Sequence, residues 1–111
     1  MKNWMNITSE EDLQGIIERS TARTQIIFKD STTCGISAHA KERLLDGFDI
    51  IDGKADFNYL DLLTYRPISN LIAKLLDVTH QSPQIIVLKD KKVIYTASHH
   101  AISPDSIAKV L

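Results

Sequence analysis

The chain has 111 residues, of which 43% are hydrophobic and 24% are charged, and its formal net charge at pH 7 is −1. This length is enough for one hydrophobic core and too short for two domains, so we expect a single globular domain over residues 1–111. Acidic and basic residues are interspersed, which argues against a nucleic-acid partner because such proteins normally carry a basic face.

Cysteine content and the N-terminus bear on the cellular compartment. The chain has one cysteine, which excludes a disulfide within the chain, and small secreted domains more often carry an even set of cysteines. Met1–Asn6 lacks the apolar segment of a signal peptide, and no stretch approaches the roughly 18 apolar residues of a membrane span. We therefore expect a cytoplasmic protein with no membrane partner.

The first part of the chain is expected to form a helix, a strand and a second helix. Thr8 and Glu11 have the spacing of a capping box ahead of an apolar stripe, which predicts a helix over about residues 9–20. The apolar run in 25–29 predicts a buried strand. Beyond it, apolar residues recur at helical spacing, and Gly47 is the expected stop of this helix. These apolar positions are Ile36, Ala40, Leu44, Leu45 and Phe48.

The second part is expected to form a strand, a helix, a hairpin and a last helix. Residues 56–62 read as a strand, and Pro67 suits the first turn of an amphipathic helix. The apolar positions of this helix are Ile68, Leu71, Ile72, Leu75 and Leu76. Two runs rich in β-branched residues, 84–88 and 93–95, flank a polar turn and predict a hairpin. Ser103 is an expected N-cap for a C-terminal helix.

This order of elements predicts an α/β fold. Parallel strands need crossover helices that cover both surfaces of the sheet. We therefore expect a central mixed four-stranded sheet with helices on both faces.

The single cysteine, Cys34, lies in the polar segment 31–37 between the predicted strand and helix. Attack on a disulfide requires a thiolate, and a free cysteine with a pKa of about 8.5 is mostly protonated at neutral pH. Backbone N–H groups and the helix dipole at such a junction can stabilise the thiolate. Cys34 is therefore a candidate nucleophile, which its polar neighbours favour over a small buried hydrophobe. Asp30 would oppose thiolate formation if it lay close.

A strand, a cysteine at a helix start and a Ser-Pro pair just before the third strand together resemble the thioredoxin fold. Within that fold, the segments TCGIS at 33–37, HQSPQ at 80–84 and ASH at 97–99 resemble the monothiol bacilliredoxins. These are small redox proteins of the bacillithiol system in Gram-positive bacteria, and the resemblance covers nearly the whole chain. Gly35 departs from the proline that often follows the cysteine in this family and is closer to the Cys-Gly-Phe-Ser motif of monothiol glutaredoxins.

The resemblance implies thiol–disulfide exchange, with bacillithiol as the thiol co-substrate. The Cys34 thiolate would attack the mixed disulfide between bacillithiol and a client protein, which frees the client and leaves Cys34 capped. A second low-molecular-weight thiol would then restore Cys34. The implied partners are bacillithiolated client proteins, and the protein itself would be a monomer or weak dimer that serves redox homeostasis.

The resemblance also assigns the residues around the thiol. Thr33, Gly35 and Ile36 would shape the loop, although Gly35 also fits an ordinary tight turn. Ser82 and Pro83 would orient the bound thiol across a cis peptide bond, which the low frequency of cis proline alone would not predict.

Lys29 and Ser37 each allow two kinds of interpretation, a role in the site and an ordinary structural role. Lys29 would face the carboxylates of bacillithiol, and the alternative is an exposed lysine at the end of a strand. Ser37 stands where a dithiol protein has its second cysteine, and its hydroxyl either donates to the Cys34 thiolate, faces solvent or bonds a backbone carbonyl.

The histidines do not predict a metal site. His39 and His80 have no recognised ligand spacing with each other or with Cys34, and His99 and His100 are adjacent, so in a strand they would face opposite sides. We expect no metal, while His80 or His99 could assist thiolate formation.

Two functions of other classes compete with the oxidoreductase. Gly35 and Ser37 allow a glutaredoxin-like carrier in which Cys34 of two chains and two thiol cofactors hold an iron–sulfur cluster. A redox-inert interaction module would also keep the fold, since fold does not fix function.

Overall fold

The computed structural model describes residues 4–31, 33 and 35–111. The described strands are β1 (Trp4–Asn6), β2 (Gln25–Asp30), β3 (Asp56–Asp61), β4 (Gln84–Lys89) and β5 (Lys92–Ser98). The α-helices are α1 (Glu10–Arg19), α2 (Gly35–Asp46), α3 (Arg66–Leu75) and α4 (Pro104–Ala108), and short 3-10 helices lie at η1 (Phe48–Ile50) and η2 (His99–Ala101).

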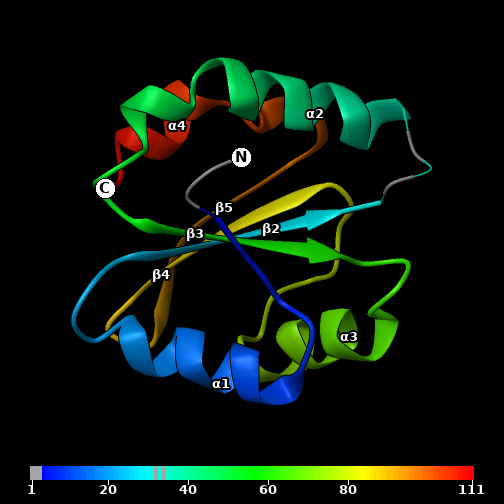
Figure 1. The fold of residues 1–111 in the computed structure, drawn as a ribbon, viewed down its shortest axis with the longest axis vertical. Helices are drawn as coiled ribbons and strands as arrows, with labels where there is room; N and C mark the ends of the chain where they lie inside the picture. The colour runs from blue at the N-terminus through cyan, green and yellow to red at the C-terminus, as the bar shows by residue number, and fades with distance from the viewer. Residues whose placement is uncertain (1–3, 32, 34) are drawn as a thin grey trace.

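The strands form one mixed sheet in the order β1-β3-β2-β4-β5. β3 pairs in parallel with β1 and β2, whereas β4 is antiparallel to both β2 and β5. Figure 1 shows α1 and α3 below the sheet and α2 and α4 above it. The predicted α/β fold is confirmed. The sheet has a fifth strand, because three residues at the N-terminus pair with the free edge of β3.

Helix starts follow the sequence with one change of residue. Ser9, not Thr8, caps α1, and its side chain accepts from the Asp12 N–H at 3.1 Å. The Asp12 carboxylate in turn accepts from the Thr8 N–H at 3.0 Å, so Asp12 takes the part expected of Glu11. At the other end of the chain, Ser103 caps α4 by accepting from the Ser106 N–H, as predicted.

The buried face of α2 differs from the prediction. Ser37, Ala40 and Leu44 are buried, whereas Ile36 and Leu45 are 40% and 42% exposed. Positions 37, 40 and 44 share a face at helical spacing, and this face, shifted from the predicted one, turns toward the sheet. A serine therefore occupies a position that the apolar pattern had given to Ile36.

Two apolar cores separate the sheet from its helices. Phe28 and Phe57 belong to the core on the α2 and α4 side, and Ile27 and Leu60 belong to the core on the α1 and α3 side. Because side chains alternate along a strand, the consecutive residues at the end of β2 also face opposite sides.

Gly47 ends α2 where the chain passes α4, and the space there admits no side chain. A Cβ at this position would lie 2.5 Å from Cγ and 2.7 Å from Cβ of Pro104. We expect Gly47→Ala to lower the free energy of unfolding by about 1–3 kcal/mol through this overpacking. Urea denaturation followed by circular dichroism measures the loss.

Gly15 in α1 provides the matched control. A Cβ there meets only the flexible end of Arg19, at 3.1 Å. Gly15→Ala is expected to be neutral or to stabilise the protein by about 0.5–1 kcal/mol, because alanine favours a helix interior. Equal losses in the two variants would contradict the close approach of Pro104.

Candidate active site

The thiol segment connects β2 to α2. Cys34, the predicted nucleophile, lies outside the described residues, and Thr33 and Gly35 on either side of it are exposed. The N–H of Ser31 donates to the Ser37 hydroxyl at 3.2 Å, so the two ends of the segment are joined. The wholly buried Ser37 does not face solvent, which rules out that interpretation of its hydroxyl.

Space around Gly35 bears on its two interpretations. An added Cβ would meet nothing within 4 Å. Packing therefore does not require glycine at this position, and room is left next to Cys34 in the sequence. The exposed Ile36 side chain follows on the same helix start.

The proline loop lies at the same end of the sheet as the thiol segment. The Ser82-Pro83 bond is cis, as the resemblance implied. Lys29 near the end of β2 pairs with Gln84 at the start of β4, so the segment after β2 and the loop before β4 are neighbours. Ser82 Oγ is buried without a hydrogen-bond partner in the described part of the chain.

The side chain of Gln84 holds this loop. Its amide donates to the carbonyl of Thr79 at 3.0 Å, and its oxygen accepts from the N–H of Gln81 at 3.4 Å. Sequence reasoning gave Gln84 no role in holding this loop, although a buried amide at such a position signals hydrogen bonds to a nearby loop.

Lys29 is wholly buried, so its interpretation as an exposed lysine is wrong. β2 continues through Asp30 and places the Lys29 side chain on the α3 side of the sheet. Its ammonium donates to the carbonyl of Ser69 at 3.1 Å and lies 3.3 Å from Nδ1 of His80. Burial lowers the pKa of Lys29 from 10.5 to about 8. The amine is not presented on the surface, so it would act on a bound carboxylate only through its charge.

His80 shares this environment. Its pKa is lowered first by burial and then by the positive charges of Lys29 and Arg66. The imidazole is therefore neutral at pH 7, and Nδ1 can accept a hydrogen bond from the Lys29 ammonium. The structure thus joins His80 to Lys29, a pairing that spacing in the sequence did not reveal.

Asp30 faces the opposite side of the sheet, toward α2. It is 2% exposed, and its Oδ2 accepts from the hydroxyl of Tyr59 on β3. Burial raises the pKa of the Asp30 carboxyl, an effect that the bond from Tyr59 and the charge of Lys41 oppose. A higher pKa weakens the opposition to a thiolate expected from this carboxylate.

A small pocket of about 190 Å³ adjoins this carboxyl. It is lined by Asp30, Ser31, Ala38 and Lys41, so it lies between the end of β2 and α2, beside the thiol segment. Lys41 Nζ lies 5.0 Å from the centre of the Tyr59 ring. Sequence reasoning did not predict the bond between Tyr59 and Asp30, because the two residues are far apart in the chain.

Histidine placement differs from the prediction at one point. His99 and His100 lie in η2, not in a strand, because the chain leaves β5 at Ser98. His99 takes a positive φ of 53°, and its carbonyl accepts from Arg43 of α2 at 3.1 Å. Among the described residues, no group of three or more histidine, cysteine or acidic side chains could hold a metal ion. No described helix is long and apolar enough to cross a membrane.

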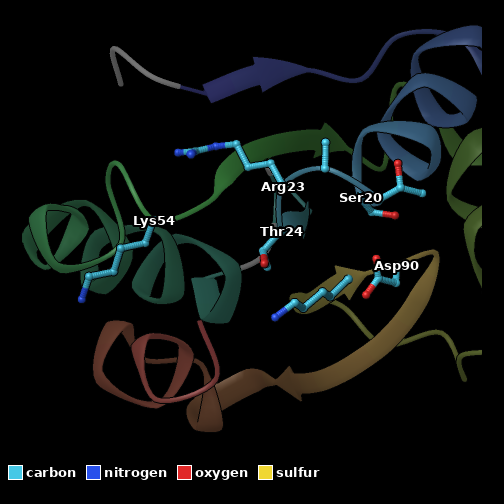
Figure 2. Close-up of a pocket in the computed structure, with 8 residues that line it drawn as sticks. Ser20, Arg23, Thr24, Lys54 and Asp90 are labelled. Atoms are coloured by element: carbon cyan, nitrogen blue, oxygen red, sulfur yellow. The ribbon is translucent and has the colours of Figure 1, made fainter.

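A pocket of about 310 Å³ lies at the other end of the sheet (Figure 2). Thr24 precedes β2 and Asp90 follows β4, so this pocket is remote from the thiol segment. Arg23 is already paired with Asp56 at 2.8 Å, and the side chains of Arg23 and Lys54 point away from Ser20 in Figure 2. Its position and dispersed charges make this pocket a poor candidate for the thiol chemistry.

Comparison with known proteins relates this arrangement to thiol redox proteins. The family model described as monothiol bacilliredoxin BrxC matches residues 5–107. A solved protein described as an oxidoreductase with a thioredoxin fold is 27% identical, with a TM-score of 0.84 over 96% of this chain and 92% of its own.

Two thioredoxins share the fold at lower identity. The Fasciola hepatica thioredoxin is 15% identical, with a TM-score of 0.70 over 96% of this chain and 94% of its own. Mitochondrial thioredoxin 3 from Saccharomyces cerevisiae is 19% identical, with a TM-score of 0.69 over 96% of this chain and 91% of its own. These two likenesses concern the fold alone.

Proposed function

Because the chain belongs to the monothiol bacilliredoxin family, we propose that it is a thiol–disulfide oxidoreductase that removes bacillithiol from protein mixed disulfides. Family and fold together indicate a thiol redox function in general. The observation that carries the specific proposal is the shared location of the Cys34 segment and the cis Ser82-Pro83 loop at one end of the sheet.

The proposed reaction has two steps that balance. In the first, the Cys34 thiolate attacks the bacillithiol sulfur of a client's mixed disulfide, a new disulfide joins Cys34 to bacillithiol, and the client leaves as a thiolate that takes a proton from solvent. In the second, the thiolate of a further low-molecular-weight thiol attacks the bacillithiol sulfur. A disulfide of the two small thiols is released, and the Cys34 thiolate is restored.

The remaining site residues are proposed to act as the resemblance implies. Thr33, Gly35 and Ile36 surround Cys34 in the sequence and shape its loop. Ser82 and Pro83 orient the bound thiol from the facing loop. We assign the protein to the cytoplasm, where a thiol pool keeps Cys34 reduced.

Incubation of the reduced protein with a bacillithiol-capped client tests the proposal. We expect intact mass spectra to show bacillithiol on Cys34 and the free thiol on the client, with faster transfer than from a glutathione-capped client. Cys34→Ala should show no transfer. Absence of transfer to a folded protein whose Cys34 can still be alkylated would overturn the proposal, and a brown dimer on anaerobic iron–sulfur reconstitution would replace it with the cluster carrier.

A further inference from the structure

Asp30 carries a buried oxygen atom to which no described residue donates a hydrogen bond. The side chain is 2% exposed, and the hydroxyl of Tyr59 donates to its Oδ2. Oδ1 is also buried and has no partner within residues 4–31, 33 and 35–111. An unsatisfied buried acceptor is costly, so such an atom in a folded protein signals a missing donor.

Lys41 of α2 supplies a positive charge near this carboxyl. Its ammonium lies over two aromatic rings, 5.0 Å from the centre of the Tyr59 ring and 5.5 Å from that of the Trp4 ring. It forms no ion pair with a carboxylate in the described part of the chain. Tyr59 therefore contacts both charges, Asp30 through its hydroxyl and Lys41 through its ring face, and the two charges do not pair with each other.

Both charges line the same pocket of about 190 Å³. Ser31 after β2 and Ala38 of α2 complete the lining, and Ala38 and Lys41 lie one turn apart on the helix. The volume exceeds the roughly 30 Å³ that one water molecule takes up in the liquid, so the pocket has room for a small organic molecule. Because Ser31 and Ala38 have short side chains, the two charged groups are its main binding features.

The charges of this pocket select the kind of ligand. A lone cation would bind Asp30 but would be repelled by Lys41, and a lone anion would meet the reverse arrangement. Asp61 acts on Asp30 as a further negative charge, which favours an ammonium at Oδ1. A molecule with one ammonium and one carboxylate suits both groups and leaves the net charge unchanged. The smallest molecules of this kind are the α-amino acids.

We propose that this pocket binds an α-amino acid group, whose ammonium donates to Oδ1 of Asp30 and whose carboxylate accepts from Nζ of Lys41. The inference goes beyond the proposed function and does not use Cys34, so neither result of the transfer assay changes it. The group can belong to a free amino acid or to a larger molecule that carries it, such as a γ-glutamyl peptide.

Titration of the isotope-labelled protein with glycine at pH 7, followed by NMR, tests this site. We expect saturable shifts of the amide signals of Ser31, Ala38 and Lys41, with a Kd of about 1 mM, which is within reach of so small a ligand. Methylammonium and acetate each carry one of the two charges and should bind at least about tenfold more weakly. Tighter binding of γ-glutamylglycine than of glycine would assign the pocket to a larger ligand, and equal or weaker binding would assign it to free amino acids.

Two variants each remove one of the charges. Asp30→Asn keeps the shape of the buried side chain, and Lys41→Met keeps a linear side chain at a half-buried position of α2. Each should weaken glycine binding by about tenfold. Lys54→Met is the control, since Lys54 is an exposed lysine that lines the pocket at the other end of the sheet. Absence of saturable shifts in the wild type, binding of methylammonium or acetate as tight as that of glycine, or an unchanged Kd in folded Lys41→Met would overturn the inference.

Discussion

Phe57→Ala is expected to lower the free energy of unfolding by about 4 kcal/mol, because removal of a buried aromatic ring loses its transfer free energy and leaves a cavity. Phe57 is the second residue of β3 and is 1% exposed. Its ring centre lies 5.6 Å from those of Trp4 and Phe48 and 6.4 Å from that of Phe28. One substitution therefore loosens contacts to β1, β2 and η1 together.

Urea denaturation at pH 7, followed by circular dichroism, measures this loss. Ile94→Ala is the matched control, since Ile94 is also a large apolar strand residue but is 43% exposed on β5. The control should lose less than about 1 kcal/mol. Comparable losses in both variants would show that Phe57 does not close the core on the α2 and α4 side.

Local signals in the sequence predicted most of the fold. A serine followed by a proline, as at Ser103, marks a helix start, and Pro67 marks the start of another helix. The three residues of β1 carry no such signal, because their pairing with β3 depends on an edge that only the folded sheet provides. The cis state of Ser82-Pro83 followed from the resemblance and not from composition.

The candidate site was harder to predict because its contacts join distant segments. In the sequence, Lys29 looks like a polar residue at the end of a strand. In the structure it is buried and contacts Ser69 of α3 and His80 of the proline loop, which follow it in the sequence by 40 and 51 positions. Likewise, Asp30 reads as a solvated acid until Tyr59 of the neighbouring strand supplies its hydrogen bond. Alternation along β2 then sends the two charges to opposite faces, a consequence of the strand continuing beyond its apolar run.

Stability should depend on pH through Lys29. Its pKa is about 8 in the folded protein against an ordinary value of 10.5, so between these values the unfolded chain binds more protons. The contribution of Lys29 to the free energy of unfolding therefore rises with pH between the two pKa values and is lowest below pH 8. This difference in pKa corresponds to about 3 kcal/mol in the free energy of unfolding.

Lys29→Met removes this dependence, so at pH 7 the variant is expected to be more stable than the wild type by up to about 3 kcal/mol. Loss of the ammonium does not leave its two partners buried without a hydrogen bond. The Ser69 carbonyl lies within α3, where a backbone N–H of the helix can donate to it, and His80 is exposed.

Urea denaturation of both proteins from pH 6 to pH 10 measures the difference, which should shrink toward zero as the pH approaches 10. Tyr59 titrates with a raised pKa because of burial and its bond to Asp30, but it is present in both proteins and cancels in the comparison. A difference that stays constant with pH would contradict a buried ammonium.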